Sequence, residues 1–184
     1  MVTDTRTLIN AAALAEFREH GYERATVRGI AERAGIRIST LYAHIASKED
    51  LFLALVAPVL DQAAQDLAAI RASGLPLKEQ LRRAIVIGAT QFDEHDPELF
   101  IYLADFFPAA ADGAHHAYDA QWAELIEEGR AAGLLRADLD PKVIAYGILG
   151  MINWMHQWYR PGGRFSAREI GEMFAAMVID GLAE

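Results

Sequence analysis

The stretch from Thr26 to Phe52, TVRGIAERAGIRISTLYAHIASKEDLF, decides the fold of this chain. Thr26 is a helix-capping residue, and the apolar residues after it recur at helical spacing. Gly35 follows where a helix needs a left-handed residue to end. Ser47 and Asp50 then form a capping box for a longer helix. Two compact helices joined by a glycine turn predict a helix-turn-helix, the unit that places a recognition helix in the DNA major groove.

The remaining sequence also carries helical patterns, with no convincing strand. Capping and breaking residues predict helix starts at Asp96–Pro97, Asp112, Asp140–Pro141 and Ser166, and helix ends at Ser73–Pro76, Pro108, Gly133 and Pro161–Gly163. Pro58 falls inside the predicted helix after Ser47, where it predicts a kink. We therefore expect an all-α protein of about nine helices. Its predicted parts are a helix-turn-helix domain at residues 1–46 and a larger helical domain at residues 47–184.

Charge is distributed unevenly along the chain. The 184 residues hold 17 Lys and Arg against 26 Asp and Glu, a net charge of −9, which by itself argues against nucleic acid as a partner. Residues 1–50, however, are neutral, with 7 basic and 7 acidic residues. Between residues 24 and 48 the basic side chains are Arg24, Arg28, Arg33, Arg37 and Lys48, against one acid. This predicts a local basic face on an acidic body, with a solvated helix face as the alternative.

The chain has the composition of a cytoplasmic protein. It has no cysteine, and 53% of its residues are hydrophobic, enough for a buried core. The N-terminus shows no signal-peptide pattern, and no uncharged apolar run approaches the roughly 20 residues that span a bilayer. We expect a cytoplasmic protein with no membrane partner.

Residues from about 8 to 52 resemble the DNA-binding domain of the TetR family of bacterial repressors. The motifs that carry the resemblance are His20-Gly21-Tyr22, Thr26-x-Arg28-x-Ile30-Ala31, Ala34-Gly35-Ile36, Leu41-Tyr42-x-His44 and Ser47-Lys48-Glu49-x-Leu51. The chain departs from the family pattern in four places. Ile45 stands for a usual Phe, Gly29 for an acid, Arg37 for a Ser cap and Ser39 for a Gly.

The resemblance implies a set of DNA contacts. Tyr42 and Lys48 match family positions that contact phosphate, and Thr26 is a further phosphate candidate at a helix N-terminus. Candidates for base edges are Arg37, Ser39 and Thr40, with Arg28 and His44 as lesser ones. For Arg37 a phosphate contact is an equal alternative, and for Tyr42 packing is the alternative.

The resemblance also implies a homodimer on a palindromic operator. Helices near the C-terminus carry broad apolar faces, which in the family form a four-helix interface. The candidate interface residues are Ile148, Ile152, Met155, Ile170, Phe174, Met177 and Val178. The alternative is that these faces cover the core of a single chain.

A small hydrophobic effector is the expected ligand of the larger domain, because aromatic residues gather there with few charges. The candidate lining residues are Phe92, Phe100, Leu103, Phe106, Phe107, Trp122, Tyr146, Asn153, Trp154 and Trp158. The segment from Asn153 to Ile170 is similar to TetR regulators of fatty-acid and steroid breakdown, which respond to acyl-coenzyme A thioesters. That similarity implies an acyl-coenzyme A effector, with Arg160, Arg164 or Arg168 near its phosphates. A non-coenzyme aromatic or lipophilic compound, as in efflux regulators, is the alternative.

Other function classes have weaker support in the sequence. His115 and His116 are adjacent, so on a helix they point about 100° apart and do not share a metal. No nucleophile elbow, phosphate loop or zincin pattern occurs, so we expect no enzyme, no cofactor and no metal. A third possible function class is a DNA-binding protein that is regulated by a protein partner instead of a small ligand. The family default is repression relieved by the effector.

Overall fold

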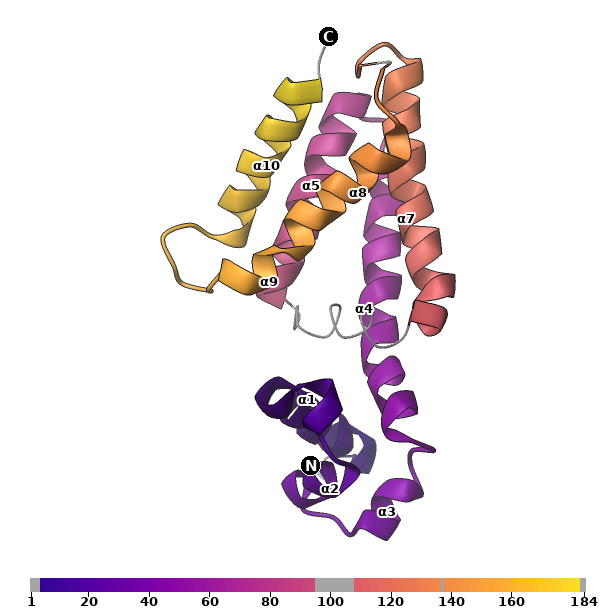
Figure 1. Cartoon of the computed structure of the whole chain (residues 1–184), viewed down its shortest axis with the longest axis vertical. Helices are drawn as coiled ribbons and strands as arrows, with labels where there is room; N and C mark the ends of the chain where they lie inside the picture. The colour runs from indigo at the N-terminus through magenta and orange to yellow at the C-terminus, as the bar shows by residue number, and fades with distance from the viewer. Residues whose placement is uncertain (1–3, 95–107, 137, 183–184) are drawn as a thin grey trace. The chain divides into compact units, whose positions relative to one another are not determined.

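The computed structural model describes residues 4–94, 108–136 and 138–182, and every regular element in these ranges is a helix (Figure 1). In chain order the helices are α1 (Thr5–Arg24), α2 (Val27–Ala34), α3 (Ile38–Tyr42), α4 (Lys48–Arg71), α5 (Leu77–Glu94), α7 (Pro108–Ala131), α8 (Pro141–Asn153), α9 (Met155–Trp158) and α10 (Ala167–Leu182). The all-α prediction is confirmed. The predicted short helix after Asp96 lies outside the described residues.

The chain forms two compact units, one ending at Pro58 and the other beginning at Val59. The division falls inside α4, later than the predicted boundary after residue 46. Pro58 lies within α4, which stays one helix from Lys48 to Arg71, and a bend at this point stays a prediction. Residues of both units therefore belong to one continuous helix.

The first unit is built around the apolar stripe of α1. Ile9, Ala13 and Phe17 recur every four residues and are almost fully buried. The Phe17 ring packs edge-on against Phe52 of α4 with centroids 5.4 Å apart. Aromatic pairs of this geometry add to the free energy of burial, so α1 and the start of α4 share one core.

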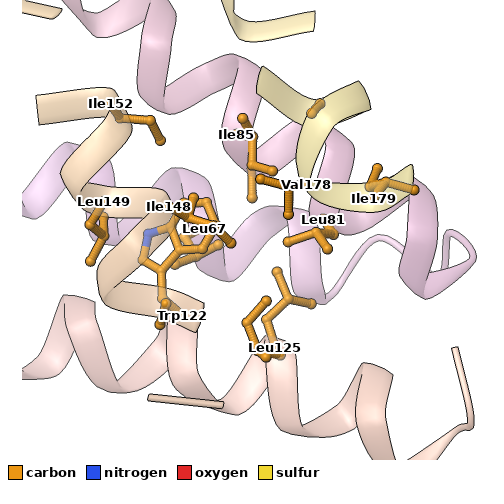
Figure 2. Packing of buried hydrophobic residues seen from close by; sticks show 14 of the residues in the cluster. Leu67, Leu81, Ile85, Trp122, Leu125, Ile148, Leu149, Ile152, Val178 and Ile179 are labelled. Atoms are coloured by element: carbon orange, nitrogen blue, oxygen red, sulfur yellow. The ribbon is translucent and has the colours of Figure 1, made fainter. Parts of the chain in front are cut away.

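The second unit is built from α5, α7, α8, α10 and the rest of α4. Trp122 of α7 is fully buried, and Figure 2 shows its indole among Leu67 of α4 and Ile148 and Leu149 of α8. At the end of α4, Arg71 donates to Glu124 and Glu128 of α7 at 2.7 Å each. These contacts make one apolar interior that several helices share.

Two helix boundaries differ from the sequence expectation. α7 begins at Pro108, whereas the sequence predicted that Pro108 ends a helix and Asp112 caps the next one. Proline is well suited to the first helical position, where its missing N–H is not needed. The predicted single helix from Asp140 to Pro161 is also wrong in detail, because α8 ends at Asn153 and α9 follows after Trp154.

Among the described residues, α4 is the one helix long and apolar enough to cross a membrane by length and composition. Seven of its apolar side chains are buried within the two units, namely Leu51, Phe52, Val56, Leu60, Ala63, Leu67 and Ile70. Such burial is what a core helix of a globular protein shows, so we assign α4 to the protein interior.

Close packing of α10 on α5 depends on Gly171. A Cβ at this position would lie 2.9 Å from the Val86 Cα and 3.0 Å from the Ala89 Cβ. We predict that Gly171→Ala lowers the free energy of unfolding by about 1–3 kcal/mol, because backbone atoms of α5 would have to move. Urea unfolding of the two proteins measures the difference.

Gly88→Ala on α5 is the matched control for this prediction. Its Cβ would meet the Ile152 Cδ1 at 3.1 Å, the far end of a flexible side chain. We expect little loss there, because alanine also favours a helix over glycine by about 1 kcal/mol. A Gly171→Ala protein as stable as Gly88→Ala would contradict the close-packing account.

Candidate functional site

The start of α2 is fixed by two side-chain oxygens from different helices. The Thr26 hydroxyl accepts from the Gly29 amide at 3.0 Å, which confirms the predicted cap. The Thr26 amide donates to the Glu16 carboxylate of α1 at 3.5 Å. In a capping box that second acceptor comes from an acid at the position of Gly29. Here α1 supplies the acid.

This arrangement explains why glycine occupies position 29. A Cβ on Gly29 would overlap the Glu16 carboxylate, so the residue must lack a side chain. Glu16 is 4% exposed, and it also accepts from the Arg33 Nε at 2.6 Å. The acceptor that the family pattern has at position 29 of α2 is therefore provided here by Glu16 of α1. This accounts for the departure from the family pattern at Gly29.

The turn between α2 and α3 ends α2 as the sequence predicted. Gly35 has φ 68° and ψ 26°, the left-handed conformation that favours glycine. The Ile36 amide donates to the Ala31 carbonyl at 3.1 Å, which closes the helix end. The chain then enters α3 at Ile38, so the two helices form the predicted helix-turn-helix.

α3 presents a polar surface to solvent, while two buried apolar residues anchor it to the first unit. Leu41 is fully buried, and Ile45 just after the helix is 6% exposed. The remaining predicted base-edge and phosphate candidates of this segment are exposed, namely Arg37, Ser39, Thr40, Tyr42 and His44. The 54% exposure of Tyr42 decides against packing as its main role. These five side chains form what we call the α3 face.

The Arg33 side chain is 33% exposed, but its charge is paired with carboxylates of α1, so it does not add to an open basic face. Its guanidinium pairs with Glu16 and with Glu19 of α1. Hydrogen bonding to the two carboxylates raises the pKa of Arg33, and the same contact lowers the pKa of Glu19. The pair ties α2 to α1.

Lys48 has a similar internal role. Its ammonium donates to the carbonyls of Tyr22 at 2.7 Å and Ala25 at 3.0 Å, with Glu23 at 3.4 Å. It also lies 4.3 Å from the centre of the Tyr22 ring. Burial lowers the pKa of Lys48. Because the three N–H donors point to the end of α1, we remove Lys48 from the candidate phosphate contacts.

The other cations are differently placed. Arg24 donates to the His20 carbonyl at 3.1 Å, and Arg28 pairs with Glu32 one turn along α2 at 2.9 Å. The Arg28 pair is exposed on both sides, so it is worth little and Arg28 stays a candidate. In the described part of the chain Arg37 makes no side-chain hydrogen bond or ion pair. The predicted basic face therefore reduces to Arg24 at the end of α1, Arg28 in the first turn of α2 and Arg37 before α3.

Half of the effector candidates lie where the structure gives no side-chain description. Phe100, Leu103, Phe106 and Phe107 fall outside the described residues, and the Phe92 side chain is likewise not described. The other five candidates are described, and they divide into one interior residue and four surface residues.

Trp122 is the interior candidate. Tyr118, one turn earlier on α7, packs edge-on against it at 6.3 Å, and burial raises the pKa of Tyr118 to about 12. The Tyr118 side chain also interacts with the Trp122 indole through a hydrogen bond, so Trp122 and Tyr118 form a small polar pair inside an apolar interior.

The other four described candidates face outward from a single chain. Tyr146 and Trp158 are each 48% exposed, Trp154 is 62% exposed, and Asn153 is exposed as well. Among the described residues they lie at the surface of one chain and not in its apolar core. The sequence analysis predicted that they line a pocket because they are mostly aromatic. However, α8 is apolar on more than one side, and the spacing of its apolar residues does not show which side is covered.

The residues predicted for the dimer interface are mostly buried in the core of a single chain. Five of the seven have buried side chains, 9% exposed or less, within one chain: Ile148, Ile152, Met155, Ile170 and Val178. They pack in the core and offer little area to a second copy. Phe174 is partly buried, and Met177 is 64% exposed.

Met177 belongs to an exposed apolar stripe on α8 and α10, whose other members were not among the interface candidates. We define this stripe as Val143, Tyr146, Gly147, Gly150 and Trp154 with Met173, Met177 and Gly181. An open groove of about 450 Å³ runs within it, lined by Ile144, Gly147, Ile148, Met151, Met177, Val178 and Gly181. The i, i+3 and i+4 spacing of its members was the signal that could have found it.

Comparison with known proteins settles the family. Residues 9–55 match the model for bacterial regulatory proteins of the tetR family, and residues 74–182 match the tetracyclin repressor-like C-terminal domain. The chain belongs to the TetR family. Members and curated relatives are transcriptional repressors, not enzymes, and the helix-turn-helix is the DNA-binding part of the family's architecture.

Two curated relatives cover nearly the whole TetR-family chain. The HTH-type transcriptional repressor KstR2 of Mycobacterium tuberculosis is 29% identical over 181 residues, 94% of this chain and 90% of the relative. KstR2 of Rhodococcus jostii is 28% identical over 186 residues, 97% and 91% of the two chains. The structure of the M. tuberculosis protein, a ketosteroid transcriptional regulator, superposes with a TM-score of 0.86 at 27% identity, covering 100% of this chain and 97% of that one.

Lys48 and Arg37 give a paired prediction for this TetR-family chain. Lys48→Met should lower the free energy of unfolding by about 1–3 kcal/mol, because helix-end carbonyls lose their donor. Arg37→Ala should leave stability within about 0.5 kcal/mol and weaken specific DNA binding by about 5- to 150-fold for each half-site. Urea unfolding and DNA titration at several salt concentrations measure both. If Lys48→Met is as stable as the wild type and the salt dependence of its DNA affinity falls by the amount expected for one phosphate contact, Lys48 contacts DNA after all.

Proposed function

We propose that this protein is a ligand-responsive repressor that binds a palindromic operator as a homodimer and is released by a small hydrophobic effector. The observation that carries the proposal is the helix-turn-helix unit with an exposed, largely polar α3 face and Arg37 free to contact DNA. The effector class favoured by the resemblance of the C-terminal segment is an acyl-coenzyme A thioester. A function on DNA places the protein in the cytoplasm.

Two observations support the dimer: the short α3, which would contact few bases, and the exposed apolar stripe. α3 is five residues long, too short for one copy to bind a DNA site tightly and selectively. The stripe on α8 and α10 exposes side chains as large as Trp154 and Met177, at 62% and 64%. Glycines within the stripe permit close approach of two helices. A second copy related by a twofold axis would cover the stripe and present two α3 helices to the two half-sites.

The apolar interior and the C-terminal loop support the effector class. Trp122 and Tyr118 place an indole N–H and a phenol hydroxyl within the otherwise apolar interior. Arg160, Arg164 and Arg168, between α9 and the first turn of α10, are exposed. Arg160 donates to the Tyr159 carbonyl at 2.7 Å, and the Arg164 guanidinium lies 5.0 Å from the centre of the Phe165 ring. None of the three pairs with a carboxylate in the described part of the chain, so all can meet phosphate charge.

The relatives support a steroid-like acyl part. KstR2 is named a ketosteroid regulator, and the resemblance is to regulators of fatty-acid and steroid breakdown. A lipophilic compound without coenzyme A is the second candidate, favoured if the outward-facing Trp154 and Trp158 are covered by the second copy and not by the coenzyme. The two candidates differ in their need for the three arginines.

Release would work by a shift between two arrangements of the dimer. The effector must prefer an arrangement whose α3 helices do not match the half-site separation, because a ligand with equal affinity for both shifts nothing. α4 carries residues of both units and contains Pro58, so it is the element through which the effector acts.

The deciding experiment is binding of the purified protein to its own upstream DNA, with and without acyl-coenzyme A thioesters and the matching free acids. Salt-sensitive binding to an inverted repeat that one thioester class abolishes supports the whole proposal. Release by free acids or other lipophilic compounds alone favours the second effector class. DNA binding that nothing in the panel changes would contradict the effector half, and absence of specific binding would contradict the repressor half.

Met177→Glu tests the dimer surface. A carboxylate in the centre of the apolar stripe should be buried without a partner, so the dimer should dissociate at concentrations where the wild type is intact. Specific DNA affinity should fall with it by at least about a hundredfold, since half-site binding is then no longer linked. Analytical ultracentrifugation and DNA titration measure the two effects.

Leu134→Glu is the control for this substitution. Leu134 is also an exposed apolar residue of the second unit, at 43%, but it lies outside the stripe. It should leave both association and DNA affinity unchanged. Equal behaviour of the two variants would mean that the stripe is not the interface.

A further inference from the structure

One large apolar side chain on α3, that of Ile38, is 45% exposed. The large apolar side chains of the first unit that are exposed in the described residues are Leu8 at 40%, Ile38 at 45% and Tyr42 at 54%. Tyr42 carries a hydroxyl that suits a phosphate, whereas Ile38 has no polar atom. Ile38 is the first residue of α3 and lies between Arg37 and Ser39 of the α3 face.

The packing of α3 does not need this side chain. Leu41 is fully buried and Ile45 is 6% exposed, and these two residues anchor the helix to the first unit. A β-branched residue is also a weaker helix former than alanine, so neither burial nor propensity explains isoleucine here. What remains is its position on the face that the proposed function turns toward DNA.

The chemistry of the major groove supplies an apolar partner. Each base pair presents hydrogen-bonding groups there, and thymine alone adds a methyl group at C5 that apolar side chains contact. Arg37, next to Ile38, suits guanine, whose O6 and N7 accept two hydrogen bonds from one guanidinium. Arg37 is the N-cap of α3 and Ile38 is its first residue, so the two side chains leave the same end of the helix from Cα atoms about 3.8 Å apart.

We propose that Ile38 is a specificity residue that contacts the C5-methyl group of a thymine in each half-site, beside the guanine that Arg37 contacts. The inference rests on the proposed binding of operator DNA. It adds to that function a base and a chemical group: each half-site contains a thymine next to a guanine, and the protein detects the methyl group of that thymine.

Deoxyuridine isolates this contact, because it differs from thymidine only by the missing methyl group. Binding sites are first selected from random-sequence DNA with the full-length protein. Each thymine of a selected duplex is then replaced in turn by deoxyuridine. One thymine per half-site should be sensitive, with affinity falling about fourfold for one replacement and about fifteenfold for both, as expected for about 0.8 kcal/mol per methyl-sized group.

Ile38→Ala connects the effect to the side chain. This variant should bind thymine and uracil duplexes equally, with an unchanged melting temperature because Ile38 is outside the core. Leu8→Ala is the matched control, since Leu8 is similarly exposed in the same unit but lies on α1. It should keep the full preference for thymine.

The outcomes separate this inference from the function on which it rests. If selected DNA binds tightly but no thymine is sensitive to loss of its methyl group, Ile38 has no such role. The same holds if Ile38→Ala still distinguishes thymine from uracil, because another group then detects the methyl. Failure to select any sequence would overturn the repressor proposal itself, and this assignment with it.

Discussion

The buried Glu16 carboxylate is the interaction on which the first unit depends. Its two oxygens serve α2 at both ends, accepting from the Thr26 amide at the N-terminus and from Arg33 near the C-terminus. A carboxylate that is 4% exposed is stable only when it is paired, and here the partners belong to the helix that it positions. The turn at Gly35 and α3 follow from α2, so the recognition surface depends on this one side chain of α1.

The same constraint explains why charge counting overstated the DNA surface. Arg33 and Lys48 appear in the sequence as members of a basic run, yet one pairs with carboxylates of α1 and the other donates to carbonyls at its end. Glu16 and Arg33 are 17 residues apart, and Lys48 lies 26 residues from Tyr22. Such tertiary pairings leave no local signal. The proposed DNA surface therefore holds few cations, and we expect specificity to come largely from α3.

Local features were predictable because their causes are local. The caps at Thr26, Ser47 and Asp140 and the capping box of Ser166 with Glu169 all form as the sequence indicated. The left-handed turn at Gly35 forms for the same reason. The faces of α8 and α10 were not predictable, because a helix that is apolar on several sides has no phase that distinguishes core from interface. The structure assigns Ile148 and Ile152 to the core and leaves Val143, Trp154 and Met177 exposed.

Hydrogen exchange of full-length Glu16→Gln, followed by mass spectrometry, tests the role of Glu16 most directly. Glutamine keeps the size of the side chain but loses the charge, at a cost of about 2 kcal/mol for a charged hydrogen bond. The account predicts that the amides of α2 exchange about thirtyfold faster, while α5 and α10 are unchanged. Glu19→Gln, which changes the exposed partner of Arg33, should have little effect. Unchanged protection of α2 in Glu16→Gln, or a loss spread evenly over both units, would contradict the central role of Glu16.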